Sequence, residues 1–283
     1  MLLFKSLELT PLPFAKRLAY LYARTLDRAV PRLRRVGRIN LAMAFPKMAV
    51  EEREALIDGV FRSIGRVLLA IARSPSINCE TVGQWIRYEG YEHFERALAR
   101  GKGVLFATGH LGTWELSAFA HAILSAPMGV VVRPLDNPHL DAFVEKRRGM
   151  SGNHLISKRD FARPILHALR RNQAVGILVD QNVVPEAGVF VDFFGTRACS
   201  GTTFAKIAAR SGAAVIPGFA FWSEDEQRHI LHFYPAVAMT GDLEADTAAI
   251  QKAVELAIRE HPDQWLWIHR RWKTRPAGEP PIY

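Results

Sequence analysis

Residues 101–119 read GKGVLFATGHLGTWELSAF, and this stretch decides which fold is expected. The continuous apolar run over 104–107 predicts a short strand with helices on both of its faces. A polar loop containing His110 follows the run, and a helix is expected to begin near Thr113. Ligands of open α/β sheets bind beyond the carboxyl ends of the strands, so this loop is where chemistry is expected.

The loop and the helix together carry the pattern His-x4-Glu, formed by His110 and Glu115. An imidazole can take a proton near neutral pH, and a nearby carboxylate can fix its tautomer and stabilise its charged form. On one continuous helix the two side chains would be about 140° apart, so they converge only if His110 lies in the loop. By itself, the spacing also describes a His that caps a helix with a Glu in the first turn.

Other blocks in the chain add to this pattern. They are Asn40-Leu41-Ala42-Met43-Ala44-Phe45-Pro46, Val132-Arg133-Pro134-Leu135-Asp136-Asn137-Pro138, Val179-Asp180-Gln181-Asn182, and the block from His261 to Lys273. Together with the His-x4-Glu loop they resemble the lipid A biosynthesis late acyltransferases, or lauroyl/myristoyl acyltransferases, of the lysophospholipid acyltransferase-like superfamily. The blocks occur in the family order from about residue 40 to the end of the chain.

The resemblance implies transfer of a fatty acyl group from an acyl carrier protein or acyl-CoA thioester to a hydroxyl of a lipid A precursor or related glycolipid. His110, assisted by Glu115, would remove the proton of that hydroxyl. No covalent enzyme intermediate, metal or cofactor other than the thioester co-substrate is expected. The implied location is the cytoplasmic face of a bacterial inner membrane, in a peripheral or monotopic arrangement.

Two other functions remain open from the residues alone. The same His could activate water in a thioesterase or lipid hydrolase. The chain could also be a non-catalytic membrane-binding protein on the same scaffold, although the presence of His110, Glu115 and Arg133 argues against that alternative.

Composition limits the class of protein. The 283 residues are 49% hydrophobic, enough for a large core in one domain with an appendage. Cys79 and Cys199 are the only cysteines, which gives no disulfide framework and favours a reducing, intracellular compartment. The sequence has no metal-ligand spacing such as HExxH or paired cysteines, so no metal is expected.

The net charge of +9 is concentrated at the amino terminus, where residues 1–40 hold nine Lys or Arg against two acidic residues. A helix over 13–30 would place Phe14, Leu18, Leu21, Tyr22 and Leu26 on one face with basic flanks. Such a helix either lies on an anionic membrane surface or docks on the core with a solvated basic edge. An acidic acyl carrier protein is a further partner for this charge, and nucleic acid is not expected because no nucleic-acid-binding motif accompanies it.

The rest of the chain alternates between strand and helix patterns. A long helix is expected over 50–74, and further helices over 91–100, 113–124, 138–148, 161–171, 202–211 and 243–260. Strands are expected over 86–89, 104–107, 129–133, 154–156, 174–179, 214–220 and 229–234. This alternation predicts an α/β fold with a mixed, largely parallel sheet flanked by helices. The family resemblance implies that this fold is similar to that of the glycerolipid acyltransferases. Residues 1–48 are expected to form the basic helical membrane-surface segment, and 49–283 the acyltransferase domain.

Several further side chains are candidates for the site. Arg133 follows an apolar strand and could stabilise an oxyanion or bind a phosphate, or pair with Asp136 or Glu145 instead. Asp180 could orient His110 or bind the acceptor, or only cap a turn. Gln181 follows directly and is assigned to substrate binding. Asn137 is assigned to substrate binding as well, and it is also expected to cap a helix that begins at Pro138.

The remaining candidates are assigned to substrate binding: Arg147, Arg148, Phe193, Phe194 and Arg271. The two Phe residues could form part of an acyl pocket, followed by a helix amino terminus near residue 202. Ser200 is not expected to be a nucleophile, because the G-x-S-x-G elbow is absent. In the final block, Trp265, Ile268, His269 and Trp272 have the spacing of one helical face, which favours packing in the core together with a basic interface.

Overall fold

A computed structural model describes residues 2–158 and 161–283. The sheet of seven strands has the order β1-β9-β8-β2-β5-β3-β4, and all neighbours are parallel except β8 and β9. The strands are β1 Ile86–Glu89, β2 Val104–Thr108, β3 Gly129–Val132, β4 His154–Ser157, β5 Ala174–Leu178, β8 Ala214–Ser223 and β9 Arg228–Phe233. The expected mixed, largely parallel sheet is therefore confirmed.

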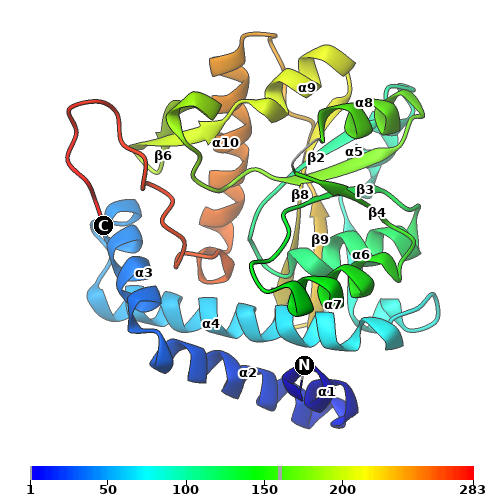
Figure 1. Cartoon of the computed structure of the whole chain (residues 1–283), viewed down its shortest axis with the longest axis vertical. Coiled ribbons are helices and arrows are strands. Elements are labelled where there is room, and N and C mark those ends of the chain that lie inside the picture. Colours follow the sequence, from blue (N-terminus) through cyan, green and yellow to red (C-terminus); the bar gives the residue numbers. More distant parts are fainter. Residues whose placement is uncertain (1, 159–160) are drawn as a thin grey trace.

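Helices cover both faces of this sheet (Figure 1). The helices are α1 Leu2–Leu9, α2 Leu12–Ala29, α3 Pro31–Ala44, α4 Val50–Arg73, α5 Tyr91–Leu98, α6 Trp114–Leu124, α7 Pro138–Gly149, α8 Ala162–Arg170, α9 Thr203–Ser211 and α10 Leu243–Glu260. Helices α5 and α6 contribute to the apolar core on one face, and α8, α9 and α10 to the core on the other. Short 3-10 turns are η1 Ser74–Ser76, η2 Val82–Gln84, η3 Pro185–Ala187 and η4 Pro262–Gln264.

A two-stranded hairpin lies outside the main sheet and was not expected. It consists of β6 Gly188–Phe193 and β7 Thr196–Gly201. The two connecting residues, Phe194 and Gly195, both have positive φ angles, 56° and 76°. Such a turn matches the twist of paired strands, but Asn-Gly or Asp-Gly is its usual signature. The Phe-Gly pair therefore gave only a weak turn signal.

The chain after Trp265 is not a helix, so the helical face expected there is wrong. Instead, the segment runs alongside the loop that carries His110: Leu266 N donates to His110 O at 3.0 Å, and Gly112 N donates to Gln264 O at 2.9 Å. Gly112 has a φ of +64°, and a Cβ there would lie 2.0 Å from Ala220 O. The loop is thus held between β8 and the terminal segment, at a position that only glycine fits.

Helix α2 docks on α4 through small residues. Ala15, Ala19 and Ala23 are buried, whereas Phe14 and Leu21 are 61% and 54% exposed. A Cβ at Gly65 of α4 would lie 3.2 Å from Ala19 O, so the two backbones approach closely. Phe14 and Leu21 therefore remain exposed, whereas Leu18 and Tyr22 are partly buried against the cluster formed with α1 and α4. None of the helices in residues 2–158 and 161–283 is long and apolar enough to cross a bilayer.

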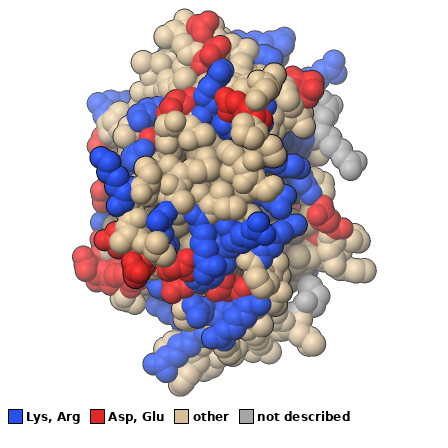
Figure 2. All heavy atoms as spheres, turned by 90° about the vertical axis from the view of Figure 1, so that its left-hand side faces the viewer, with Lys and Arg blue, Asp and Glu red and all other residues tan. Residues whose placement is uncertain are grey.

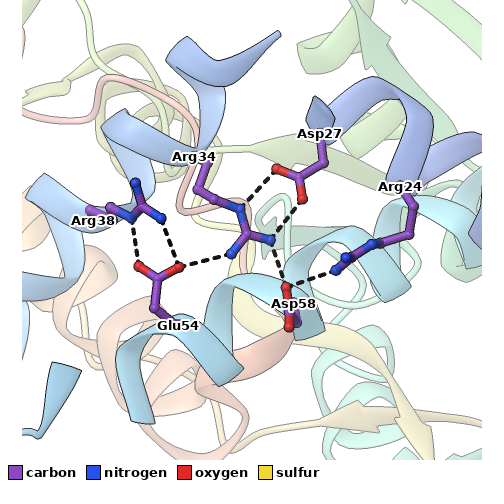
Figure 3. A network of polar contacts seen from close by, with 6 residues as sticks. All are labelled: Arg24, Asp27, Arg34, Arg38, Glu54 and Asp58. Carbon is purple, nitrogen blue, oxygen red and sulfur yellow. Dashed lines mark hydrogen bonds and ion pairs between the residues drawn. The ribbon is translucent and has the colours of Figure 1, made fainter. Parts of the chain in front are cut away.

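Charged side chains crowd the surface near this helical segment. Figure 2 shows Lys and Arg side chains interleaved with Asp and Glu over the lower half of the face on the left of Figure 1. Some of these charged side chains form ion pairs between neighbouring helices, as Figure 3 shows. Arg34 of α3 forms ion pairs with Asp27 of α2 at 2.7 Å and with Glu54 and Asp58 of α4 at 2.9 and 2.6 Å. Arg34 therefore ties three helices together.

Candidate active site

His110 and Asp180 meet at the carboxyl edge of the sheet. Thr108 ends β2 and pairs in register with Leu178, which ends β5. His110 and Asp180 each follow two residues later, so parallel pairing brings them to the same height above the sheet. His110 Nδ1 lies 2.9 Å from Asp180 Oδ1, and His110 N donates to Asp180 Oδ2 at 2.8 Å. Asp180, which was considered for orienting His110, for binding the acceptor and for capping a turn, therefore lies in direct contact with His110.

Asp180 is held in one orientation by buried donors. Its side chain is 2% exposed, and Trp265 Nε1 donates to Oδ2 at 2.8 Å. Burial opposes ionisation, but His110 and Trp265 together hold the pKa of the Asp180 carboxyl well below its ordinary value. A Cβ at Gly109 would lie 3.1 Å from this carboxyl group, so a residue without a side chain leaves the space for it. Asp180 is therefore a buried, ionised carboxylate.

This arrangement fixes the role of each His110 nitrogen. A carboxylate accepts hydrogen bonds, so Nδ1 carries the proton and Nε2 presents its lone pair. Gln181 Nε2 lies 3.3 Å from His110 Nε2, and the Trp114 ring packs edge-on at 4.9 Å between centroids. The side chain of His110 is 16% exposed. The unprotonated Nε2, which lies within a long hydrogen-bond distance of the Gln181 amide, is therefore at a partly open, sheltered position suited to accepting a proton.

Glu115 has a different partner from the one expected. In the first turn of α6, its carboxylate accepts hydrogen bonds from Arg148 Nε and Nη2 of α7 at 2.9 and 2.5 Å. Their side chains are 12% and 22% exposed. Burial disfavours charge on Arg148, but the contact with Glu115 raises the pKa of Arg148 above its ordinary value. Glu115 therefore anchors a guanidinium, and the group that contacts the His110 ring nitrogen is Asp180.

A cavity of about 570 Å³ opens at these side chains. His110, Trp114, Glu115, Arg148 and Gln181 all line it. Most of its other walls are apolar and come from β2, β3, β5 and α6. A cavity of this size and lining is typical of sites for small-molecule or lipid-chain ligands.

Arg133 lies at the rim of this cavity, and its side chain is largely exposed to solvent. It lines the cavity, and its Nη2 lies 2.5 Å from Asp136 Oδ1, as one of the alternatives anticipated. The two side chains are 69% and 92% exposed. Asn137 is an exposed helix cap, as expected, because its side chain accepts from His139 N and Leu140 N at the start of α7. Arg133 is therefore free to reorient toward a ligand, and Asn137 shapes the loop beside it.

Three candidates for substrate binding lie in the core. Phe193 and Phe194 are 0% and 4% exposed and pack against tryptophans of the terminal segment. Arg271 is fully buried and donates to Cys199 O and Ser200 Oγ at 2.9 and 2.6 Å. Burial lowers the pKa of Arg271 to about 10. These three residues do not line the cavity.

Arg147 points away from the site as well. Its guanidinium binds Glu8 of α1 at 2.7 Å, which ties the amino-terminal helix to α7. In the described part of the chain, no three His, Cys, Asp or Glu side chains gather as metal ligands would. Of the predicted residues, the cavity therefore brings together His110, Glu115, Arg133, Arg148 and Gln181, with Asp180 directly behind His110.

Trp265 and Trp114 were missed as site residues. Trp265 was assigned to a packed helical face, yet its indole nitrogen orients Asp180 across 85 positions of sequence. A buried indole N–H usually requires an acceptor, which is the signal that could have linked it to a buried carboxylate. Trp114 lies within the His-x4-Glu pattern itself.

Nearly the whole chain is similar to known proteins of one family. The model of the bacterial lipid A biosynthesis acyltransferase family matches residues 1–274. The lipid A biosynthesis palmitoleoyltransferase of Escherichia coli K12 is 31% identical over 271 residues, covering 94% of this chain and 88% of that protein. The lauroyltransferase of the same organism is 29% identical over 276 residues, covering 96% and 90%. The myristoyltransferase is 27% identical over 278 residues, covering 97% and 85%.

Proposed function

This chain belongs to the bacterial lipid A biosynthesis acyltransferases, and on that basis we propose that it transfers a fatty acyl group to a hydroxyl of a lipid A precursor or related glycolipid. The donor is a thioester of acyl carrier protein or of coenzyme A. One observation supports this function most strongly. The unprotonated Nε2 of a carboxylate-bound His110 lies at a largely apolar cavity whose lining includes Arg133 and Arg148.

The proposed reaction is direct transfer with His110 as general base. His110 Nε2 takes the proton of the acceptor hydroxyl while the hydroxyl oxygen forms a bond to the thioester carbonyl carbon. Asp180 keeps Nδ1 protonated and stabilises the imidazolium that forms. The tetrahedral intermediate then breaks its carbon–sulfur bond, and the thiolate that leaves takes the proton from His110. The products are an ester and a free thiol, so protons and bonds balance.

Glu115 contributes through Arg148 in this proposal. Its two hydrogen bonds hold the guanidinium at the cavity wall, where positive charge favours an anionic transition state or a phosphate of the acceptor. The His-x4-Glu pattern would then place one carboxylate near the base and one cation near the substrate.

Arg133 supplies a second cation at the cavity. Its pair with Asp136 is exposed on both sides, so exchanging that partner for a ligand costs little. We assign to it stabilisation of the thioester oxyanion or contact with a headgroup phosphate. Both roles require a guanidinium that can move toward the substrate.

The amino-terminal helices would bring the site to its substrate at a membrane. Phe14 and Leu21 are exposed on α2, and Lys16, Arg17 and Arg28 of the same helix are exposed as well. Apolar side chains flanked by cations suit the interface of an anionic membrane, such as the cytoplasmic face of a bacterial inner membrane. The surplus of positive charge would also favour encounter with an acidic acyl carrier protein.

The proposal is tested by following a labelled acyl group from acyl carrier protein, or from coenzyme A, to a lipid A precursor. Wild type should form acylated product, and His110→Ala should be slower by on the order of a hundredfold or more. His154→Ala, an exposed histidine on β4, is the matched control and should retain activity. Equal rates for wild type and His110→Ala would refute the mechanism. Donor consumption at the same rate with and without acceptor would instead identify a hydrolase.

A further inference from the structure

The cavity extends to both faces of the sheet. One part lies beneath α6 and is lined by Phe106, Phe119 and Met128, which belong to the core on that face. Another part reaches Ile177 and Phe204, which belong to the core on the opposite face. We call the part beneath α6 the inner lobe. The two parts join at the carboxyl edge of the strands, where His110 lies.

Two strand glycines leave room for the inner lobe. Gly218 of β8 and Gly176 of β5 line the cavity on either side of β2, which carries Phe106. A Cβ at Gly218 would be in ordinary contact with the rings of Phe106 and Phe233, each at 3.7 Å, and with His232 O at 3.8 Å. A Cβ at Gly176 would lie 2.8 Å from the terminal methyl of Met128. Side chains at these two positions would therefore occupy the space that is now open.

A buried histidine closes the deep part of the lobe. His121 lies seven residues beyond Trp114 on α6, which corresponds to about 10 Å along the helix. It is 2% exposed, its Nδ1 lies 2.8 Å from Tyr88 Oη, and its ring packs edge-on against Phe94 and Phe106. Burial lowers the pKa of His121 to about 4, so the ring is neutral at physiological pH. The His121 ring is thus held by a hydrogen bond and by contacts with two aromatic rings.

The polarity of the cavity walls indicates which part of the substrates each region can hold. Arg133, Arg148 and Lys158 line the outer part of the cavity, where a phosphate-bearing acceptor would find its counter-charges. The inner lobe has apolar walls, and the group that must lie next to His110 is the thioester carbonyl with its hydrocarbon tail. Placing an acceptor headgroup in the inner lobe would bury its polar groups without partners.

We propose that the inner lobe holds the hydrocarbon tail of the acyl donor, and that its floor at His121, Phe106 and Met128 sets the longest chain the enzyme transfers efficiently. This inference rests on the proposed acyl transfer and adds the residues that determine chain length. A chain longer than the lobe must displace packed rings or leave its terminal carbons in water. Each methylene misplaced in this way changes the rate by about tenfold or more.

The test is competition among saturated acyl donors from octanoyl to palmitoyl, with product chain lengths measured by mass spectrometry. Gly218→Val should lower the ratio of longer to shorter chains in the product by about tenfold or more. Met128→Ala, which enlarges the same lobe, should shift the product toward longer chains. The matched control is Gly201→Val, because Gly201 lines the cavity from the end of the β6–β7 hairpin, where a Cβ would be in ordinary contact at 3.5 Å with Val183.

The outcomes separate this inference from the proposed function. Absence of product from wild type with every donor would reject acyl transfer itself. Transfer with an unchanged chain-length profile in Gly218→Val and Met128→Ala, or an equal change in Gly201→Val, would overturn the role of the inner lobe. If Gly218→Val fails to fold, Gly218→Ala allows the same comparison, because its added methyl remains in ordinary contact.

Discussion

His110 and Asp180 lie two residues beyond the paired strand ends Thr108 and Leu178, and their side chains meet at 2.9 Å. The contact is therefore a product of strand register: a shift of either strand by one residue would turn one of the two side chains to the other face. Trp265 then fixes the second carboxylate oxygen from the terminal segment. Three distant parts of the chain thus determine which ring nitrogen of His110 carries the proton and which one does not.

The first prediction concerns that tautomer. Asp180→Asn preserves the shape of the side chain but removes the charge that holds the proton on Nδ1. We expect the rate of acyl transfer to fall by on the order of a hundredfold or more, because Nε2 no longer reliably presents a lone pair. Transfer rates should be compared with those of Asn182→Ala, with circular dichroism to check folding. A folded Asp180→Asn protein with wild-type activity would rule out this role.

The second prediction separates two roles for Glu115. If Glu115 acts through Arg148, then Glu115→Gln and Arg148→Gln should each reduce transfer, and the double variant should be little worse than either single one. If Glu115 acts on His110 independently of Arg148, the losses should multiply. A double-mutant cycle on the transfer rate measures the difference. Multiplicative losses would contradict the division of roles proposed here.

The third prediction concerns Arg133. Arg133→Ala should reduce the rate of transfer by about a hundredfold or more if the guanidinium stabilises the oxyanion. Removal of one hydrogen-bond donor from the oxyanion hole of other enzymes has an effect of this size. Thermal stability should not change, because its pair with Asp136 is exposed. Arg163→Ala, an exposed arginine on α8, controls for the loss of surface charge. Full activity in Arg133→Ala would remove Arg133 from the mechanism.

The middle of the main sheet was predictable because β2, β3 and β5 are short apolar runs between turn signals. The same reasoning placed His110, Arg133 and Asp180 at strand ends, since that requires only the strand boundaries. It could not determine which carboxylate contacts His110, because this depends on the order of β2 and β5 in the sheet. Sequence spacing favoured Glu115, whereas strand pairing brought Asp180 closer.

Long-range packing explains the expectations that failed. Phe193 and Phe194 have the character of pocket residues, but the hairpin turn at Phe194 directs both rings toward the tryptophans of the terminal segment. Trp265 and Trp272 have helical spacing, yet the segment between them follows the His110 loop instead. In α2, the large apolar side chains were candidates for the face that docks on the core. The backbone of α2 instead lies close to Gly65 of α4, and the alanines of α2 make this contact. None of these contacts is local in sequence.

The fourth prediction is a loss of stability in mild acid. Burial lowers the pKa of both His121 and His269 from 6.5 to about 4. Below pH 6.5 the unfolded chain therefore binds protons that the folded chain does not, so stability is complete above that pH and falls as the pH drops toward 4. Near pH 5 each imidazole should account for a loss of about 2 kcal/mol in the free energy of unfolding.

Urea titrations at neutral pH and near pH 5 measure this loss. His121→Leu should show a smaller difference between the two pH values than wild type, whatever its absolute stability, because one titrating group is gone. His154→Leu removes an exposed histidine and should leave the difference unchanged. The same pH dependence in wild type and His121→Leu would contradict the assignment.

The fifth prediction tests the membrane surface. Phe14 and Leu21 of α2 are exposed, and inserting such side chains into a bilayer interface contributes about 1.5–3 kcal/mol each when burial is complete. The double variant Phe14→Ser/Leu21→Ser should therefore bind vesicles containing phosphatidylglycerol at least tenfold more weakly, as measured by sedimentation. Its thermal stability should be unchanged, because the alanine face of α2 makes the contacts with α4.

The matched control replaces two apolar residues that are equally exposed elsewhere. Val50 of α4 and Leu256 of α10 are 59% and 50% exposed, so Val50→Ser/Leu256→Ser removes comparable apolar surface away from α2. Vesicle binding should survive this change if α2 carries the interaction. Equal weakening in both double variants would mean that general surface hydrophobicity, and not α2, holds the protein at the membrane. Binding that persists in both but disappears at high salt would assign the attraction to the cations alone.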